Sequence, residues 1–100
     1  MNDLINQKIK EIEEICEKYD VKSLHVFGSA TNEEFTDKSD IDLIVSFKEI
    51  PIEKYSDNYF HLHDQFQEIF NRKIDLITDK SIKNPYFKKE VEKTKNLIYE

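Results

Sequence analysis

The sequence predicts a small α/β domain with helices packed on one main face of a mixed sheet of three, or possibly four, strands. Apolar residues recur at helical spacing in three segments, and short apolar runs with partial alternation separate them. With 1 Gly and 2 Pro in 100 residues, the joints between elements must be short. We therefore expect residues 1–100 to form a single domain.

The first three elements follow from residue spacing. Residues 3–18 predict a helix, because isoleucines recur every three or four positions with charged residues between them. Residues 23–27 predict a short strand that ends at Gly28. Residues 40–47 alternate in part between polar and apolar side chains and predict a second strand.

The second half of the chain repeats a helix–strand–helix order. Residues 54–70 carry apolar side chains at a helical period, and residues 73–78 predict a third strand. Asn84-Pro85 then predicts the start of a last helix, with apolar or small residues recurring as far as Ile98. The face of the sheet opposite the helices should present the side chains His25, Phe27, Asp40, Asp42, Ile44, Asp75 and Ile77.

Composition excludes several classes of protein. A formal net charge of −6 argues against an open, non-specific nucleic-acid surface and predicts no direct nucleic-acid partner. A single cysteine, Cys16, excludes an intramolecular disulfide. The chain shows no signal peptide and no apolar stretch near the roughly 20 residues of a membrane span, so we expect a soluble, cytoplasmic protein.

Gly28 and Ser29 follow the first predicted strand. A glycine at this point allows a positive φ or lets backbone N–H groups approach a bulky anion. The Ser29 hydroxyl can bond a phosphate oxygen, and the start of any following helix adds free N–H donors. The pair alone is equally consistent with an ordinary turn.

Asp40 and Asp42 are a stronger signal. Alternate residues on a strand point to the same face, so both carboxylates project together. A divalent cation offsets the repulsion between them, and Mg²⁺ prefers one or two carboxylates together with substrate phosphates. The alternative is an exposed strand start, with Asp40 capping a turn.

Asp75 lies early in the third predicted strand, in a run that echoes the second. If the two strands pair, Asp75 reaches the same face and side as Asp40 and Asp42. Three converging carboxylates can hold two metal ions about 3.5–4 Å apart, the arrangement used for displacement at phosphorus. The alternative is a solitary surface aspartate.

Gly28-Ser29, ten residues, and then Asp40-Ile41-Asp42-Leu43 resemble the G-S-x10-D-x-D signature of the polymerase-beta-like nucleotidyltransferase superfamily. The compact chain is similar to the minimal nucleotidyltransferase (MNT) members, which often pair with HEPN toxins. The resemblance covers nearly the whole chain, including the helix and strand that bring in Asp75. It implies a nucleotidyltransferase-like fold.

The resemblance also implies an activity. It indicates Mg²⁺-dependent transfer of AMP from ATP, with a tyrosine of a HEPN toxin as a candidate acceptor and this chain as the antitoxin. Asp40, Asp42 and Asp75 would be the catalytic and metal-binding residues, and Gly28 and Ser29 would contact the nucleotide. The acidic chain is compatible with a basic, RNA-cleaving partner.

One segment departs from the family pattern. Many minimal members carry an arginine soon after Gly-Ser, whereas residues 30–35 contain none. Lys38 is the nearest cation that could contact the triphosphate. The only arginine, Arg72, precedes the third predicted strand and suggests a structural ion pair.

Two other functions remain open at this point. The chain could be a non-catalytic antitoxin that neutralises its partner by contact and retains the carboxylates without using them. It could also be a small metal phosphohydrolase, although that leaves Gly28-Ser29 unexplained. The acceptor, the nucleotide preference and the oligomeric state do not follow from the sequence.

Overall fold

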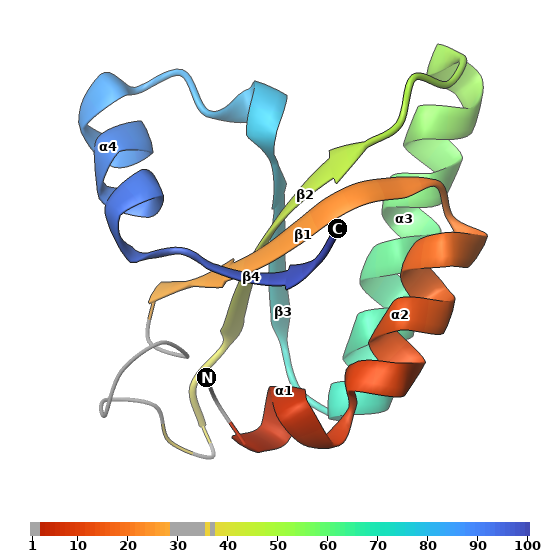
Figure 1. The fold of residues 1–100 in the computed structure, drawn as a ribbon, viewed down its shortest axis with the longest axis horizontal. Coiled ribbons are helices and arrows are strands. Elements are labelled where there is room, and N and C mark those ends of the chain that lie inside the picture. Colours follow the sequence, from red (N-terminus) through yellow and green to blue (C-terminus); the bar gives the residue numbers. More distant parts are fainter. Residues whose placement is uncertain (1–2, 29–35, 37) are drawn as a thin grey trace.

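The computed structural model describes residues 3–28, 36 and 38–100. Figure 1 shows helices on both sides of one sheet. In chain order, the elements are α1 (Asp3–Gln7), α2 (Ile9–Lys18), β1 (Val21–Phe27), β2 (Ile41–Phe47), α3 (Ile52–Phe70), β3 (Ile74–Thr78), the 3₁₀ turn η2 (Asp79–Ser81), α4 (Pro85–Thr94) and β4 (Asn96–Tyr99).

The sheet has four strands in the order β3-β2-β1-β4. β2 and β3 run parallel and are joined by α3, while β1 is antiparallel to both of its neighbours, β2 and β4. The predicted mixed α/β fold class is therefore confirmed. The sheet has four strands rather than three, and both numbers were allowed by the sequence. The pairing of the second and third predicted strands is also confirmed.

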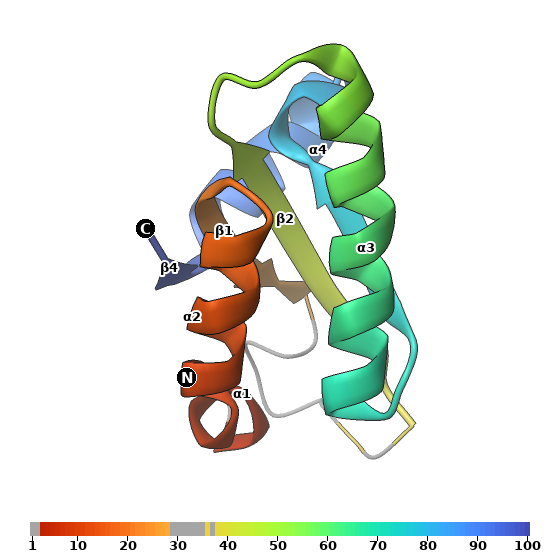
Figure 2. The same cartoon turned by 90° about the vertical axis from the view of Figure 1, so that its right-hand side faces the viewer.

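The first predicted helix is broken in two. Residues 3–18 were expected to form one helix, but α1 and α2 are separated at Lys8, whose backbone N–H donates to the Ile5 carbonyl at 3.1 Å. α1 turns away from the axis of α2 (Figure 2). The break lets Ile5 and Ile12 both reach 0% exposure in the core. Burying these two side chains therefore contributes more to the observed structure than one unbroken helix over residues 3–18 would.

The last predicted helix is too long. It was expected to reach Ile98, but α4 ends at Thr94, and the next residues form β4 along the open side of β1. Lys95 is already extended, with φ −66° and ψ 143°. Pairing with β4 provides partners for the backbone groups of β1 that would otherwise form a bare edge. This gain depends on β1, more than 60 residues earlier in the chain, and so is invisible in local spacing.

The main core lies between α1–α3 and one face of the sheet. Figure 2 shows α2 and α3 side by side across that face. The fully buried side chains that fill this layer include Ile5, Ile12, Leu24, Val26, Ile41, Leu43, Val45, Leu62 and Phe66. This is the main helical face that the sequence predicts.

α4 covers part of the opposite face. Val91, which is 2% exposed, packs with Phe27 and Ile44 of the sheet, and the partly buried Ile77 and Ile82 join this smaller cluster. The prediction that Phe27 and Ile44 lie on the face opposite the main helices is correct. They are nevertheless buried there, because α4 packs over them.

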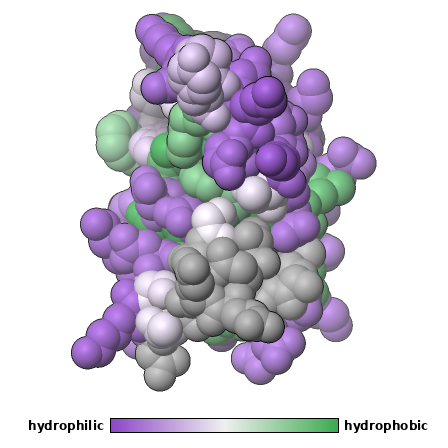
Figure 3. Space-filling view, turned by 90° about the vertical axis from the view of Figure 1, so that its left-hand side faces the viewer, coloured by the Kyte–Doolittle hydropathy of each residue, from purple (hydrophilic) through white to green (hydrophobic). Residues whose placement is uncertain are grey.

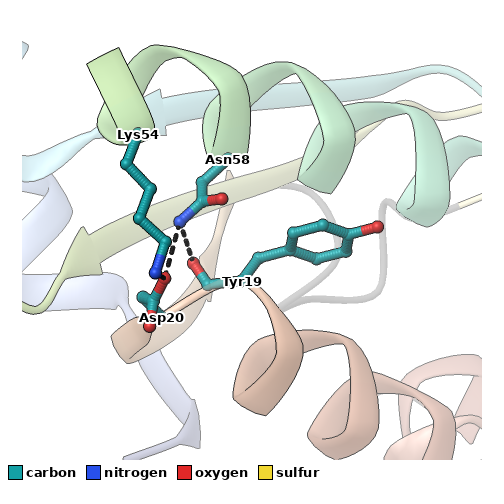
Figure 4. Close-up of polar contacts among 4 residues, drawn as sticks. All are labelled: Tyr19, Asp20, Lys54 and Asn58. Atoms are coloured by element: carbon teal, nitrogen blue, oxygen red, sulfur yellow. Dashed lines mark hydrogen bonds and ion pairs between the residues drawn. The ribbon is translucent and has the colours of Figure 1, made fainter. Parts of the chain in front are cut away.

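A polar contact fastens α3 to the turn between α2 and β1 (Figure 4). The buried Asn58 side chain donates to the Tyr19 carbonyl at 2.9 Å and to the Asp20 carboxylate at 3.0 Å. Lys54 Nζ lies 2.9 Å from the same carboxylate oxygen of Asp20. The bonds of Asp20 to Lys54 and Asn58 hold its pKa below the usual value. This contact therefore fixes one half of α3 relative to the sheet.

In the described part of the chain, no helix combines the length and the apolar composition needed to cross a membrane.

Candidate active site

The strand register gathers the predicted site residues at one end of the sheet. Phe27, the last residue of β1, lies opposite Asp42, and Asp42 lies opposite Asp75 on the parallel strand β3. Neighbouring strands are about 4.8 Å apart, and directly opposed residues share a face. Asp42 and Asp75 therefore lie side by side, and Gly28, which follows Phe27, has the Asp42 side chain directly beside it. We call this end, with Asp40 included, the carboxylate edge.

Gly28 has two reasons to be glycine. Its φ is +71°, a conformation that costs other residues strain. In addition, a Cβ at this position would overlap the Oδ2 atom of the Asp42 carboxylate. Of the two reasons for a glycine that the sequence left open, the positive φ is confirmed. The close approach of the Gly28 backbone to a carboxylate emerges only from the fold.

Asp42 is half-buried at the centre of the carboxylate edge. Burial, followed by the negative charges of Asp75 and Asp40 and a side-chain hydrogen bond with Asp75, raises its pKa from 3.8 to about 6. The raised pKa thus reflects first the partial burial of Asp42 and second the negative charges of Asp75 and Asp40. A cation bound beside Asp42 would favour its ionised form, because an opposite charge nearby lowers the pKa of a carboxyl.

Asp40 and Asp75 flank Asp42 differently. Asp75 is exposed, whereas Asp40 is half-buried and its Oδ2 lies 3.7 Å from Lys73 Nζ. Within the described residues, no group of three or more His, Cys, Asp or Glu side chains is placed so that it could hold a metal ion. The structure therefore couples the three predicted carboxylates electrostatically without forming a closed ligand cage.

The donor set suits a hard divalent cation. Mg²⁺ takes oxygen ligands, keeps several waters and is usually bound by one or two carboxylates together with substrate phosphates. Asp42 and Asp75 are adjacent across the strands, and the charge of Asp40 also raises the pKa of Asp42. An open group of carboxylates therefore fits a metal ion that arrives with its substrate.

The predicted nucleotide contacts are only partly described. Ser29 and the segment 30–35 lie outside the described residues. Lys38 is exposed in a turn near Asp40, and its backbone N–H donates to Thr36 Oγ1 at 3.3 Å. The roles of Ser29 and Lys38 toward a nucleotide remain predictions.

Two contacts near the carboxylate edge were not expected from the sequence. The Tyr59 hydroxyl of α3 donates to the Leu76 carbonyl, next to Asp75 in β3. Burial and then the charge of Asp75 raise the pKa of this tyrosine. Arg72, expected to form an ion pair, donates to backbone carbonyls beside Asp40. A single sequence carries no signal for either contact, because both partners come together through the fold.

A pocket of about 300 Å³ lies between α4 and the sheet, on the same face as Asp42. Its lining is mostly polar and comprises Lys22, Ser23, His25, Ile44, Val45, Ser46, Asp79, Ile82, Lys88, Glu92 and Lys95. Burial, followed by the charge of Lys95, lowers the pKa of His25. Figure 3 views the α4 side, where apolar patches appear between hydrophilic groups.

Comparisons with known proteins agree with this geometry. Residues 10–100 match the family described as polymerase beta, nucleotidyltransferase. A Methanocaldococcus jannaschii protein, MJ0128, provisionally named a protein adenylyltransferase, is 46% identical over 95 residues, covering 95% of this chain and 90% of its own length.

Two solved structures share the fold. A chain of a toxin–antitoxin structure with AMP-PNP gives a TM-score of 0.70 at 15% identity, covering 91% of this chain and 72% of that one. A chain of a complex between tri-AMPylated Shewanella oneidensis HEPN toxin and MNT antitoxin gives 0.65 at 13% identity, with coverages of 95% and 71%. This chain therefore belongs to the polymerase beta nucleotidyltransferase family and is a nucleotidyltransferase that resembles the protein adenylyltransferases.

Proposed function

We propose that this chain transfers AMP from ATP, with Mg²⁺, to a hydroxyl of a protein partner, and that the acceptor is a tyrosine of a HEPN-type toxin. The observation that carries the proposal is the row of Gly28, Asp42 and Asp75 across the carboxylate edge. It combines a close backbone approach with carboxylates that favour a cation. Residues 1–100 would act as one domain.

The relatives support the nucleotide, the transferred group and the type of partner in this proposal. The MJ0128 protein is named for adenylyl transfer to protein. One structure of the same fold was solved with AMP-PNP, an analogue of ATP, and another contains an AMPylated HEPN toxin beside an MNT antitoxin. The net charge of −6 is compatible with a basic partner.

The nucleotide would lie against Gly28. Glycine allows the positive φ of +71° at this position, and backbone N–H groups in such turns are effective donors to phosphate oxygens. Ser29 would add a hydroxyl donor, and Lys38 a positive charge toward the triphosphate. These contacts orient the α-phosphorus relative to the three carboxylates.

Asp40, Asp42 and Asp75 would hold the magnesium. When bound, the metal neutralises charge on the triphosphate and lowers the pKa of a coordinated hydroxyl. Asp42 must lose its proton to become a ligand, so its pKa of about 6 links metal affinity to pH.

Asp75 is the residue we assign to the acceptor side. It is exposed and can approach the hydroxyl of an incoming protein. In the reaction the tyrosine oxygen forms a bond to the α-phosphorus, the bond from that phosphorus to the bridging oxygen breaks, and pyrophosphate leaves. The carboxylate of Asp75 accepts the proton from the tyrosine.

The test uses ATP labelled at two positions. The purified protein is incubated with Mg²⁺ and a HEPN-type toxin, taken from the neighbouring reading frame where that frame encodes one. Label in the α-phosphate should appear on the partner, whereas label in the γ-phosphate should not, and mass spectrometry should find added AMP on a tyrosine. Asp42→Asn should abolish the transfer, while the exposed control Asp57→Asn should retain it.

Three results would contradict the proposal. Transfer of the γ-label would indicate a kinase. Release of phosphate without labelling of the partner would indicate a phosphohydrolase. Neutralisation of the partner by wild type and Asp42→Asn alike, with no label transferred, would indicate a binding module.

A further inference from the structure

Asp40 follows a short turn that is closed by side-chain hydrogen bonds. The Thr36 backbone N–H donates to Ser39 Oγ at 2.9 Å, and the Ser39 N–H donates to the Thr36 carbonyl at 3.0 Å. The two hydroxyls lie 3.2 Å apart. These local bonds shape the turn, but they do not attach it to the rest of the molecule.

Arg72 provides that attachment. Its Nη1 donates to the Thr36 carbonyl and to the Ser39 carbonyl, each at 3.1 Å. The Nε atom of the same side chain is buried. One guanidinium nitrogen thus joins both ends of the turn to the segment between α3 and β3. Ser39 directly precedes Asp40, so the second bond acts on the peptide unit that leads into this carboxylate residue.

The same two segments are joined on the other side of Asp40. The Ile41 backbone N–H donates to the Lys73 carbonyl at 3.2 Å, which begins the parallel pairing of β2 with β3. The residues on both sides of Asp40 are therefore attached to consecutive residues. The Ser39 carbonyl bonds the Arg72 side chain, and the Ile41 N–H bonds the Lys73 carbonyl. β3, which starts immediately afterward, carries Asp75.

We propose that Arg72 is a positioning residue for metal binding. By holding the backbone at Ser39, its guanidinium places the Asp40 carboxylate in register with Asp42 and Asp75. This inference rests on the proposed function, in which those three carboxylates hold the metal. Arg72 does not contact the metal or the substrate, and it acts through the main chain of Asp40. The departure of residues 30–35 from the family pattern plays no part in it.

The structure also separates this role from a charge effect. Lys73 brings a positive charge to 3.7 Å from Asp40, but its side chain is 75% exposed. Exposed pairs contribute little because solvent screens them. Removing Lys73 should therefore affect metal affinity much less than removing Arg72, although the lysine is the residue whose charge lies beside the carboxylate.

The experiment measures binding of Mn²⁺ and of Mn²⁺ with a non-hydrolysable ATP analogue by calorimetry. Arg72→Ala should weaken metal binding about 10- to 100-fold, the usual effect of losing a group that orients a metal ligand. Arg72→Lys should restore part of the affinity, because an ammonium can also donate to carbonyls. Millimolar guanidinium added to Arg72→Ala should have a similar effect. Lys73→Ala should stay within about threefold of wild type.

A second measurement needs neither metal nor activity. In the metal-free protein, amide hydrogen exchange at Ser39 and Ile41 should be at least about tenfold faster in Arg72→Ala, because the segment loses its attachment. The matched control is Asn58→Ala, which removes a different attachment of α3, about 18 Å along the helix from its end. It should lower stability while leaving metal affinity and these two amides unchanged.

The outcomes distinguish the two proposals. Unchanged metal affinity in Arg72→Ala, or an equal loss in Asn58→Ala, would overturn the positioning role and leave the proposed function intact. Wild type that binds metal and the ATP analogue but transfers no AMP would overturn the proposed function alone. Wild type that binds no metal would overturn both.

Discussion

At the residue scale, the proposed chemistry rests on the close approach of Gly28 and Asp42. A backbone at φ +71° and a carboxylate with a pKa of about 6 lie side by side at the end of β1. Neither residue is unusual in isolation. Their juxtaposition places a half-buried carboxylate directly against the Gly28 backbone.

Gly28→Ala should impair both the fold and the activity. The new Cβ overlaps Asp42 Oδ2, and the positive φ costs about 1–3 kcal/mol. Because the carboxylate must move, we expect AMP transfer to fall by about 10²-fold or more, by analogy with other misplaced catalytic groups. Labelled transfer and urea unfolding measure the two effects.

Asn71→Ala is the matched control for that variant. Asn71 also has a positive φ, +51°, but it is exposed at the end of α3. Asn71→Ala should lower the free energy of unfolding because of the positive φ, but AMP transfer should stay at the wild-type rate. Full AMP-transfer activity in a folded Gly28→Ala protein would show that the close approach of Gly28 to Asp42 is not needed for the reaction.

The pKa of Asp42 predicts a pH dependence of stability in the metal-free protein. Its folded pKa, about 6, lies above the ordinary value of 3.8 for an aspartate. As pH rises from about 4 to 6, the unfolded chain ionises first, so this group progressively destabilises the fold, and the penalty is complete above pH 6. With solvent screening of this half-exposed group, we expect about 1–2 kcal/mol.

Asp42→Asn should remove this component. Urea unfolding with a chelator present should show the variant gaining stability relative to wild type between pH 4 and 6, with a constant difference above that range. Asp57→Asn, on the exposed face of α3, serves as control and should track wild type. If the free energies of unfolding of Asp42→Asn and wild type differ by the same amount from pH 4 to 8, the pKa of Asp42 is not raised.

At the element scale, α3 is held at both ends by polar contacts with distant parts of the chain. Asn58 bonds the α2–β1 turn near its start, and Arg72 bonds the turn before Asp40 just beyond its end. α3 also connects β2 to β3, the strands that carry the aspartates. The attachment at the end of α3 therefore lies beside the carboxylates, whereas the attachment at Asn58 lies far from them.

Asn58→Ala should lower the free energy of unfolding by about 1–3 kcal/mol. The side chain is 6% exposed, and its loss leaves the Tyr19 carbonyl without this donor. Since Asp20 also loses one of the bonds that lower its pKa, less of its stabilisation remains to be lost as pH falls. Chemical unfolding of wild type and Asn58→Ala at pH 7 and at pH 3 measures both quantities. If Asn58→Ala lowers the free energy of unfolding equally at the two pH values, the predicted link to the pKa of Asp20 is wrong.

At the scale of the whole molecule, two apolar layers of unequal size enclose the sheet. The main core is large, whereas the layer under α4 contains only Phe27, Ile44 and Val91 as buried members among the described residues. The pocket lies in that thinner layer. α4 should therefore be the most readily detached helix.

Val91→Ala tests this difference. Val91 is 2% exposed, and removing two methyl groups should cost about 1.5–2 kcal/mol. We expect amide exchange in α4 to accelerate more than exchange in α2. Lys89→Ala, exposed on the same helix, should change neither quantity. Equal acceleration in both helices would indicate that α4 unfolds only with the whole molecule.

The sequence by itself determined the fold class and the candidate site. Helical and strand periods depend on local geometry, so they identified α3, β2 and β3 closely, and the placement of Asp75 opposite Asp42 followed from pairing those strands. Gly28 was identifiable because it is the only glycine, placed where a strand ends.

Only the tertiary structure decided the rest. The break at Lys8, the strand β4 and the packing of α4 on the second face depend on burial and edge pairing between distant segments, which local spacing does not encode. The bonds of Arg72 and the raised pKa of Asp42 likewise require partners brought together by the fold. Residue spacing records what one element prefers, whereas desolvation and long-range hydrogen bonds depend on which elements meet.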